Sequence, residues 1–322
     1  MSARIVAVGE LAGGRPTRLT LEIATLAAGL AAASGDRAAL VLVGEGASSA
    51  APEVAAHGVD VLVDDTGDAA PVALAERLAG PVREAGATWF LLGASEAGRE
   101  TAGHLVGLAD LPILAAAVEV RLEDGAPRVG QAPWGGRLRT ESAFTGSGGV
   151  VVVRPGSQAP VPAGAPGRIA PAPAAPAPTL PRPELLERSA GNASGPSIEE
   201  ARIVVGAGRG TGGAEGVALV RALADALGGT IGATRAAVDS GWIDYALQIG
   251  QTGKQIRPEL YLACGVSGAI QHAVGVRTAG TIVAIDRDAD APIGEIADLL
   301  AVGDLFAVVP ALLERLERRR SS

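Results

Sequence analysis

Apolar residues along the first 110 positions alternate between short β-branched runs and longer segments with helical spacing. The runs at 4–8, 38–46, 59–65 and 88–95 are typical of buried strands. Apolar positions three and four residues apart predict helices within 17–34, 51–58, 71–86 and 98–110. Because successive parallel strands need a crossover connection, this alternation predicts a Rossmann-like α/β domain with a mostly parallel sheet.

The pattern changes after about residue 111. Segments 114–143 and 149–155 look like strands joined by tight Asp-Gly and Gly-Gly turns, and they predict an antiparallel extension on the edge of the first sheet. Segment 155–183 carries ten of the 21 prolines. Proline lacks the backbone donor, so this segment is expected to be an extended connector or an edge segment.

Small polar residues at 189–197 interrupt the pattern a second time and place a domain boundary near residue 190. The N-terminal domain is then 1–190, with the Pro-rich segment near its end, and the C-terminal domain is 191–322. Strands are expected at 201–207, 258–266 and 280–286, and helices at 215–228 and 304–319. This order predicts a smaller α/β domain.

Composition narrows the functional classes. The chain has 322 residues, only 2% aromatic residues and a formal charge of −8, so nucleic acid is not an expected partner. A single cysteine, Cys264, excludes an internal disulfide; its apolar surroundings favour a small core residue in a reducing cytosol. We recognise no signal peptide, no apolar run long enough for membrane insertion and no metal-ligand cluster, so a cytoplasmic protein without a metal is expected.

Three glycine-containing segments of the C-terminal domain carry the rare polar chemistry. GRGTGG (208–213) follows a strand and precedes a helix, which fits either a dinucleotide-binding turn or a purely structural one. GQTGK (250–254) fails the Walker A pattern, so Lys254 is either an anion donor or a solvated turn lysine. SGAIQH (267–272) follows an apolar strand, and Ser267 is expected to cap a helix there.

These segments lie within a longer region that resembles the electron transfer flavoprotein alpha-subunit family. The resemblance is carried by PELYLACGVSGAIQHAVGVRTAGTIVAIDRDADAPIGEIADLLAVGDLFAVVPALLERL (258–316), and by VVGAGRG, GATRAAVDSGW and IGQTGK in the same order. It covers about residues 199–317, and the N-terminal half matches only in its α/β layout. For the C-terminal domain the resemblance implies an FAD-binding fold of the flavodoxin-like or DHS-like kind. The family resemblance implies one FAD per heterodimer with a beta subunit, and an AMP in that beta subunit.

The resemblance also implies an electron carrier rather than a classical single-substrate enzyme. Its donors are dehydrogenases, typically acyl-CoA dehydrogenases acting in fatty acid β-oxidation, and its acceptor is a quinone oxidoreductase. By the family's pattern, Arg235 lies over the flavin ring, the Thr252 hydroxyl reaches its N5 edge and His272 lies near the pyrimidine carbonyl. These three residues are therefore the implied catalytic residues.

The matching positions imply a larger set of cofactor-binding residues. That set comprises Arg209, Thr234, Arg235, Ile249, Gly250, Gln251, Thr252, Ser267, Gly268, Ala269, Ile270, Gln271, His272, Asp286, Asp304 and Leu305. One position departs from the family's pattern, because Asp286 stands where the family usually has asparagine. An aspartate keeps an acceptor for a ribose hydroxyl but loses the amide donor.

Two other functional classes remain open from the residues alone. A nicotinamide-dependent dehydrogenase would use GRGTGG and would need an acidic residue at the end of the next strand. Asp225 falls inside a predicted helix, which counts against this alternative. A nucleotide-binding regulatory module without redox activity is the third possibility.

Overall fold

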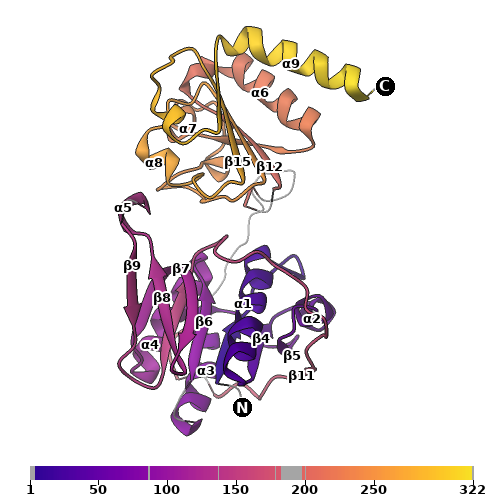
Figure 1. The fold of residues 1–322 in the computed structure, drawn as a ribbon. Coiled ribbons are helices and arrows are strands. Elements are labelled where there is room, and N and C mark those ends of the chain that lie inside the picture. The colour runs from indigo at the N-terminus through magenta and orange to yellow at the C-terminus, as the bar shows by residue number, and fades with distance from the viewer. Residues whose placement is uncertain are drawn as a thin grey trace. The chain divides into compact units, whose positions relative to one another are not determined.

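The computed structural model describes residues 4–85, 88–136, 138–177, 179–182, 198–199 and 201–320. The chain forms two compact units, Met1–Leu186 and Glu187–Ser322 (Figure 1). The predicted boundary near residue 190 and the break at 189–197 lie outside the described residues. Each unit is described by itself below.

The first unit is built on one nine-stranded sheet in the order β11-β5-β4-β1-β6-β10-β7-β8-β9. A small hairpin of β2 (Leu11–Ala12) and β3 (Arg15–Pro16) lies outside this sheet. The strands of the large sheet are β1 (Ile5–Val8), β4 (Ala38–Val43), β5 (Asp60–Asp64), β6 (Trp89–Gly93), β7 (Ile113–Glu123), β8 (Ala126–Gln131), β9 (Thr140–Ala143), β10 (Gly149–Val153) and β11 (Ile169–Pro171).

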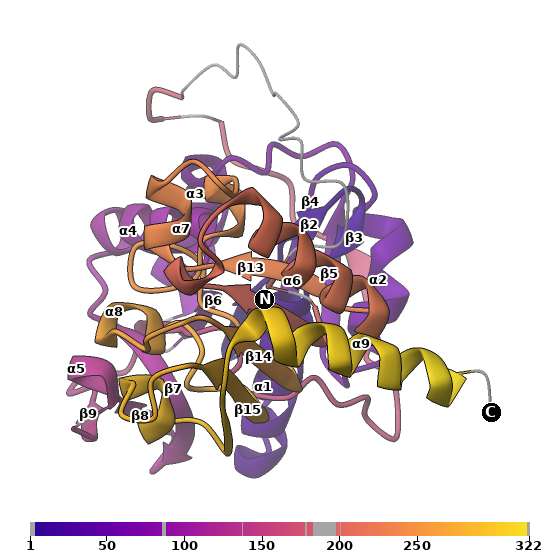
Figure 2. The ribbon, with the colours of Figure 1, turned by 90° about the horizontal axis from the view of Figure 1, so that it is seen from above.

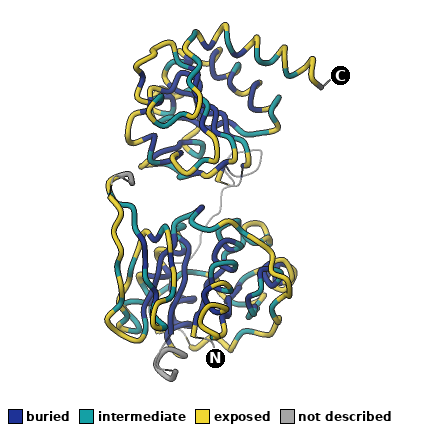
Figure 3. Tube along the Cα trace, in the orientation of Figure 1, coloured by how far each residue is buried: buried dark blue, intermediate teal, exposed yellow. Residues whose placement is uncertain are grey.

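Alternate residues of the central strands build two cores, one on each face of this sheet. Ile5 and Ala7 of β1 join the core beneath α1 (Arg18–Ser34) and α2 (Ala47–Ala55). Val6 and Val8 join the core beneath α3 (Pro71–Ala85) and α4 (Glu96–Ala109). The strands are therefore buried on both sides, as Figure 3 shows, and the predicted mostly parallel Rossmann-like sheet is confirmed.

The predicted antiparallel extension is confirmed for β7, β8 and β9. Asp124 and Gly125 both have positive φ, 53° and 78°, and they form the tight turn between β7 and β8. The prediction was wrong for β10, which pairs parallel with both β6 and β7. Its unbroken valine run is typical of a strand buried on both faces. The Gly-Gly turn was also wrong, because a short helix, α5 (Pro133–Gly136), forms there.

The described part of the Pro-rich segment lies against the first unit as an edge segment, as predicted. Its strand β11 pairs with β5 at the end of the sheet. Beyond β11, Arg77 donates to the Pro173 carbonyl oxygen at 3.0 Å, and Glu76 Oε1 accepts from the Thr179 and Leu180 backbone nitrogens at 2.7 and 2.9 Å. Two charged side chains of α3 therefore anchor the segment.

The second unit contains a five-stranded parallel sheet in the order β13-β12-β14-β15-β16. Its strands are β12 (Ile203–Ala207), β13 (Thr230–Ala233), β14 (Leu260–Cys264), β15 (Thr281–Asp286) and β16 (Leu299–Val302). Numbered within the unit, this order is 2-1-3-4-5, which is the flavodoxin-like doubly wound arrangement. The predicted smaller flavodoxin-like domain is thus confirmed, although β13 and β16 were not predicted.

Two long helices cover one face of this second sheet. Helices α6 (Ala214–Leu227) and α9 (Leu305–Arg320) lie side by side (Figures 1 and 2), over a core that includes Cys264. Cys264 is fully buried, so its predicted place in the core is confirmed, and burial raises the pKa of its thiol to about 12. Short elements and loops cover the other face; they include α8 (Ile270–Ala273) and the 3-10 turn η3 (Pro292–Glu295).

The anchoring of the Pro-rich segment leads to a prediction about pH. Hydrogen bonds from Thr179, followed by those from Arg182 and Leu180, lower the pKa of Glu76 from 4.5 to about 2. A carboxyl with a lowered folded pKa stabilises the fold fully above about pH 4.5 and loses this contribution as pH falls toward 2. Urea midpoints should therefore fall more steeply across this range for the natural protein than for Glu76→Gln.

Glu53→Gln is the matched control, because Glu53 is an exposed carboxyl on α2. It should leave the acid slope unchanged. Equal acid slopes for Glu76→Gln and the natural protein would contradict the anchoring role.

Candidate functional site

The predicted site residues gather at one edge of the second sheet. Arg209 follows β12, Thr234 follows β13, Ser267 lies just past β14, Asp286 ends β15 and Asp304 lies just past β16. Ligands of doubly wound sheets bind outside the carboxyl ends of the strands, at the point where the strand order reverses. Here that switch point lies between β12 and β14.

The two loops at the switch point are packed backbone against backbone. Gly208 donates its N–H to the Cys264 carbonyl oxygen and Gly210 to the Gly265 carbonyl oxygen, both at 2.9 Å. A Cβ atom at Gly208 would lie 2.0 Å from the Gly265 oxygen, and one at Gly210 would lie 2.7 Å from the Gly265 Cα. Glycine is therefore required here by close approach, whatever the ligand.

Arg209 lies in the 3-10 turn η1 (Arg209–Thr211) between β12 and α6. Its side chain is exposed, and it has no hydrogen bond or ion pair with any described residue. The structure thus places a guanidinium without a partner among the described residues at the switch point, beside loops packed too closely for any residue but glycine.

Thr234 and Arg235 follow β13 on the other side of β12. The Thr234 Oγ1 atom is buried and has no hydrogen-bond partner within the described residues. Arg235 begins the short helix α7 (Arg235–Asp239), and its exposed guanidinium pairs with Asp239 at 3.2 Å. An exposed ion pair of this kind contributes about 0–1 kcal/mol, so a ligand can displace it readily.

The loop from Ile249 to Lys254 lies against the start of α8. Gln251 donates its backbone N–H to the Gln271 carbonyl oxygen at 2.7 Å, so these two predicted segments are brought together. Gln251 and Thr252 are exposed, whereas Gly250 has a φ of 138° and leaves no room for a side chain beside the Gln271 oxygen. Lys254 pairs with Glu199 at 3.5 Å, and its two expected roles, an anion donor or a solvated turn lysine, stay predictions.

The segment from Ser267 to Gln271 leads into α8 and includes its first two residues. Ser267, Ala269, Ile270 and Gln271 are exposed, and Gly268 has a φ of 82°. Ser267 was expected to cap this helix, and that prediction was wrong: the cap position is Ala269, without a side-chain hydrogen bond. The reason is that Gly268 turns the chain first, and the Ser267 carbonyl oxygen accepts from Ile293 N at 3.0 Å.

His272 is buried and both of its ring nitrogens are hydrogen-bonded inside the protein. Nδ1 lies 3.1 Å from the Ile249 carbonyl oxygen, and Nε2 lies 2.7 Å from the Tyr261 hydroxyl. Because a carbonyl can only accept, Nδ1 carries the hydrogen, and Nε2 accepts from Tyr261 in the neutral ring. Burial lowers the pKa of His272 from 6.5 to about 4, which keeps it neutral near pH 7.

This arrangement gives His272 an immediate structural role that the sequence did not indicate. It joins the buried strand residue Tyr261 to the backbone of Ile249, where the loop containing Thr252 begins. A contact between the His272 ring and a flavin stays a prediction; a hydrogen bond from a ring nitrogen to the flavin would require one of these hydrogen bonds to break.

Asp286, Asp304 and Leu305 lie together where β15 and β16 end. Gly303 donates its N–H to the Asp286 carbonyl oxygen at 2.9 Å, and the Asp304 Oδ1 atom accepts from Phe306 N at 2.9 Å. Leu305 is 5% exposed and belongs to the core beneath α6. Its side chain therefore fills the core, and only its backbone remains for a ligand contact.

The structure does not favour the alternative of a nicotinamide-dependent dehydrogenase. The nicotinamide alternative needs an acidic residue after β13, where Thr234 and Arg235 stand, while Asp225 lies within α6. The described residues contain no group of His, Cys, Asp and Glu side chains suited to a metal ion. Among the helices of the described part, none is both long and apolar enough to cross a membrane.

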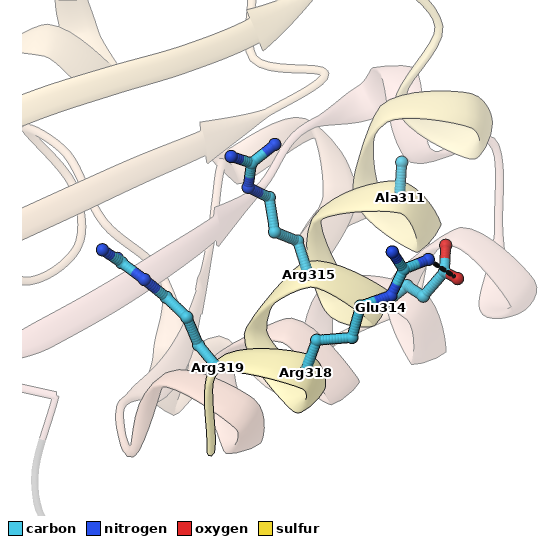
Figure 4. A pocket seen from close by; sticks show the side chains of 5 residues that line it. All are labelled: Ala311, Glu314, Arg315, Arg318 and Arg319. Atoms are coloured by element: carbon cyan, nitrogen blue, oxygen red, sulfur yellow. Dashed lines mark hydrogen bonds and ion pairs between the residues drawn. The ribbon is translucent and has the colours of Figure 1, made fainter. Parts of the chain in front are cut away.

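A hollow on α9 is lined by Ala311, Glu314, Arg315, Arg318 and Arg319 (Figure 4). All of these residues come from one helix, and Arg318 pairs with Glu314. Arginines near a helix C-terminus interact favourably with the helix dipole. We therefore read this cluster as structural.

A doubly wound sheet with glycine loops at its switch point is the arrangement on which many α/β domains bind nucleotides. Known families agree with that class. A family model described as "Electron transfer flavoprotein domain" matches residues 5–181, and one described as "Electron transfer flavoprotein FAD-binding domain" matches residues 197–277. The chain belongs to the electron transfer flavoprotein alpha-subunit family.

Three relatives named electron transfer flavoprotein subunit alpha illustrate the extent of the similarity. The Syntrophomonas wolfei protein is 34% identical over 290 residues, 88% of this chain and 91% of that protein. The Mycobacterium leprae protein is 40% identical over 230 residues, 71% of each chain. The Thermoanaerobacterium thermosaccharolyticum protein is 55% identical over 122 residues, only 38% of this chain and 37% of that protein.

The buried His272 leads to a second pH prediction. The unfolded chain binds a proton below about pH 6.5, whereas the folded chain does so only near pH 4. Stability from this group is therefore complete above 6.5 and is lost as pH falls toward 4. From a difference of about 1.4 kcal/mol per pKa unit, the total loss is up to about 3 kcal/mol.

Denaturant unfolding between pH 7 and 4 measures this loss. His272→Asn should be less stable at pH 7 but should show a flatter decline toward pH 4 than the natural protein. His104→Asn, at a half-exposed histidine on α4, is the control and should keep the natural slope. If His272→Asn lost stability with falling pH as steeply as the natural protein does, His272 would not remain neutral in the fold.

Proposed function

We propose that this chain holds one FAD at the switch point of its C-terminal domain and acts as the FAD-carrying subunit of an electron carrier. The observation that carries the proposal is the pair of packed glycine loops, one of which carries Arg209, whose guanidinium has no partner among the described residues. The match of residues 197–277 to an FAD-binding domain model supports it.

The residues present fit a dinucleotide. The packed glycine loops at 208–210 and 265–268 hold Arg209 at the switch point, and its exposed guanidinium offers a fork of donors that suits phosphate oxygens. The five strands place candidate contacts from Thr234 to Asp304 across about 19 Å of sheet edge, at roughly 4.8 Å per strand. A ligand that reaches all of them must be elongated, as FAD is.

The buried Thr234 Oγ1 supports the same fit. A buried hydroxyl without a partner is uncommon and costs about 1–3 kcal/mol. A ligand hydroxyl or carbonyl at the end of β13 would satisfy it. Thr234 therefore binds the ligand in this proposal, together with the neighbouring Arg235.

A bound flavin supplies the redox chemistry, because it can take up and release electrons one at a time. The protein orients the ring and sets its electrostatics. Arg235 keeps its charge at every physiological pH and can place a planar guanidinium against the ring. Thr252 offers a hydroxyl, and Gln251, Ser267 and Gln271 offer further exposed polar groups. His272 stays neutral and fixes the loop.

The proposal includes a partner, a beta subunit that carries an AMP. The relatives are named as alpha subunits, which supports a heterodimer. Electrons enter from dehydrogenases, such as acyl-CoA dehydrogenases, and leave to a quinone oxidoreductase. These donors and acceptors are proposed from family membership alone and are the most detailed part of the proposal.

Co-expression of the full chain with a beta subunit tests the proposal directly. The purified complex should be yellow, should show flavin absorption bands and should release FAD on denaturation. A colourless complex that binds no FAD would contradict the proposal, and one that bound NADH instead would revive the dehydrogenase alternative.

Arg209 provides a sharper prediction about affinity. Replacing it with alanine removes a charged donor at an exposed position without a protein partner, so folding should be unaffected. A hydrogen bond to a charged group contributes about 1.5–3 kcal/mol, which corresponds to roughly 10- to 100-fold weaker FAD binding. Titration of the apo-complex, followed by quenching of flavin fluorescence, measures this change.

Arg221→Ala is the matched control, since Arg221 is an exposed arginine on α6 of the same domain. It should bind FAD as the natural protein does. Equal affinities for the natural protein and Arg209→Ala would exclude Arg209 from the phosphate contact.

A further inference from the structure

Thr252 is an exposed loop residue that two side chains hold in place. Tyr245 donates its hydroxyl hydrogen to the Thr252 carbonyl oxygen at 2.8 Å. Gln248 donates from Nε2 to the Thr252 Oγ1 atom at 3.1 Å. Fixing a residue costs about 1–2 kcal/mol of backbone entropy. Two specific contacts on one exposed loop residue therefore point to a functional demand on its position.

The backbone of the same loop is also fixed. Gly250 donates to the Lys254 carbonyl oxygen at 3.1 Å, and Lys254 donates to the Gln248 carbonyl oxygen at 2.8 Å. A Cβ at Gly253 would lie 2.4 Å from that Gln248 oxygen. Gln248 is only 2% exposed, so its side chain has little freedom and serves as a rigid support for Thr252.

The direction of the Gln248 hydrogen bond determines what the Thr252 hydroxyl can do. The amide Nε2 can only donate, so Thr252 Oγ1 contributes a lone pair to that contact. No described residue accepts the hydroxyl hydrogen of Thr252. The hydroxyl is thereby prepared to donate its hydrogen away from the loop.

We infer that Gln248 and Tyr245 are positioning residues that present the Thr252 hydroxyl as a hydrogen-bond donor to an acceptor nitrogen of the flavin ring. The inference rests on the proposed function. Gln248 sets the polarity of the hydroxyl, and Tyr245 fixes the backbone that carries it. Neither residue touches the flavin itself.

An FAD analogue separates this role from a merely structural one. In 5-deaza-FAD a C–H group replaces the acceptor ring nitrogen that the Thr252 hydroxyl would reach. Gln248→Met, in the full chain co-purified with its beta subunit, should bind FAD roughly 3- to 10-fold more weakly, the range for one neutral hydrogen bond. It should bind 5-deaza-FAD as the natural complex does. Tyr245→Phe should show the same selectivity to a smaller extent.

Two further variants test the direction of the Gln248–Thr252 hydrogen bond and whether Gln248 acts through Thr252. In Gln248→Glu a carboxylate accepts the Thr252 hydrogen, so FAD binding should weaken at least as much as in Gln248→Met, again with 5-deaza-FAD unaffected. In a Thr252→Val background, Gln248→Met should have no further effect. Gln158→Met, at a glutamine of the first unit, is the control and should change neither affinity.

The inference is overturned if Gln248→Met weakens both ligands equally, or if it still weakens FAD binding in the Thr252→Val background. If Gln248→Met does not fold, Tyr245→Phe decides, because Tyr245 is 65% exposed; equal affinities for FAD in Tyr245→Phe and the natural complex then overturn the inference. Failure of the natural complex to bind either flavin overturns the proposed function itself, and the inference with it.

Discussion

The close contact between the ends of β12 and β14 is the constraint on which the site depends. Gly208 and Gly210 pack so closely against Gly265 that a side chain at either position would clash with its backbone. Because the contact is made by backbone atoms alone, it fixes the loops relative to each other without depending on a rotamer. Arg209 on one loop and Ser267 on the other are exposed at places that this contact determines.

A glycine on strand β12, Gly206, also constrains the position of the neighbouring loop. Gly206 leaves the space in which the Tyr261 hydroxyl lies; a Cβ there would be 2.0 Å from that oxygen. Tyr261 in turn donates to His272, and His272 donates to the Ile249 carbonyl oxygen. A strand glycine is thus connected, through two buried polar side chains, to the loop that carries Thr252.

The N-terminal sheet shows what a closed switch point looks like. Its strand order also reverses beside β1, between β4 and β6. There, however, a Cβ at Gly93 would lie 2.4 Å from Leu19, and the Ser95 hydroxyl donates to the Glu10 carboxylate at 2.5 Å. The glycine spaces are occupied by side chains of the protein itself. In the C-terminal domain the corresponding glycine spaces are filled by backbone of the facing loop, and the Arg209 side chain beside them is exposed.

Much of the fold could be predicted because parallel strands leave a strong apolar pattern. In the second unit the strands missed were β13 and β16: β13 contains a glycine, and both are only four residues long. The valine run of β10 was assigned to the wrong kind of pairing, since pairing partners are not encoded in periodicity. The site segments were found through their glycines and polar residues. The Tyr261–His272–Ile249 connection could not be, because it depends on side chains brought together by the topology.

The neutrality of His272 bears on how charge at the site is controlled. A ligand that accepts electrons becomes more negative, and nearby positive charge favours that state. Burial keeps His272 uncharged down to about pH 4, so near neutral pH it adds no net charge. The fixed positive charges among the candidate residues are then the guanidinium groups of Arg209 and Arg235. If a redox ligand binds as proposed, these two guanidinium groups would favour its more negative state. The Arg235 pair with Asp239 is exposed and weak, so the guanidinium can turn to the ligand without leaving a buried carboxylate behind.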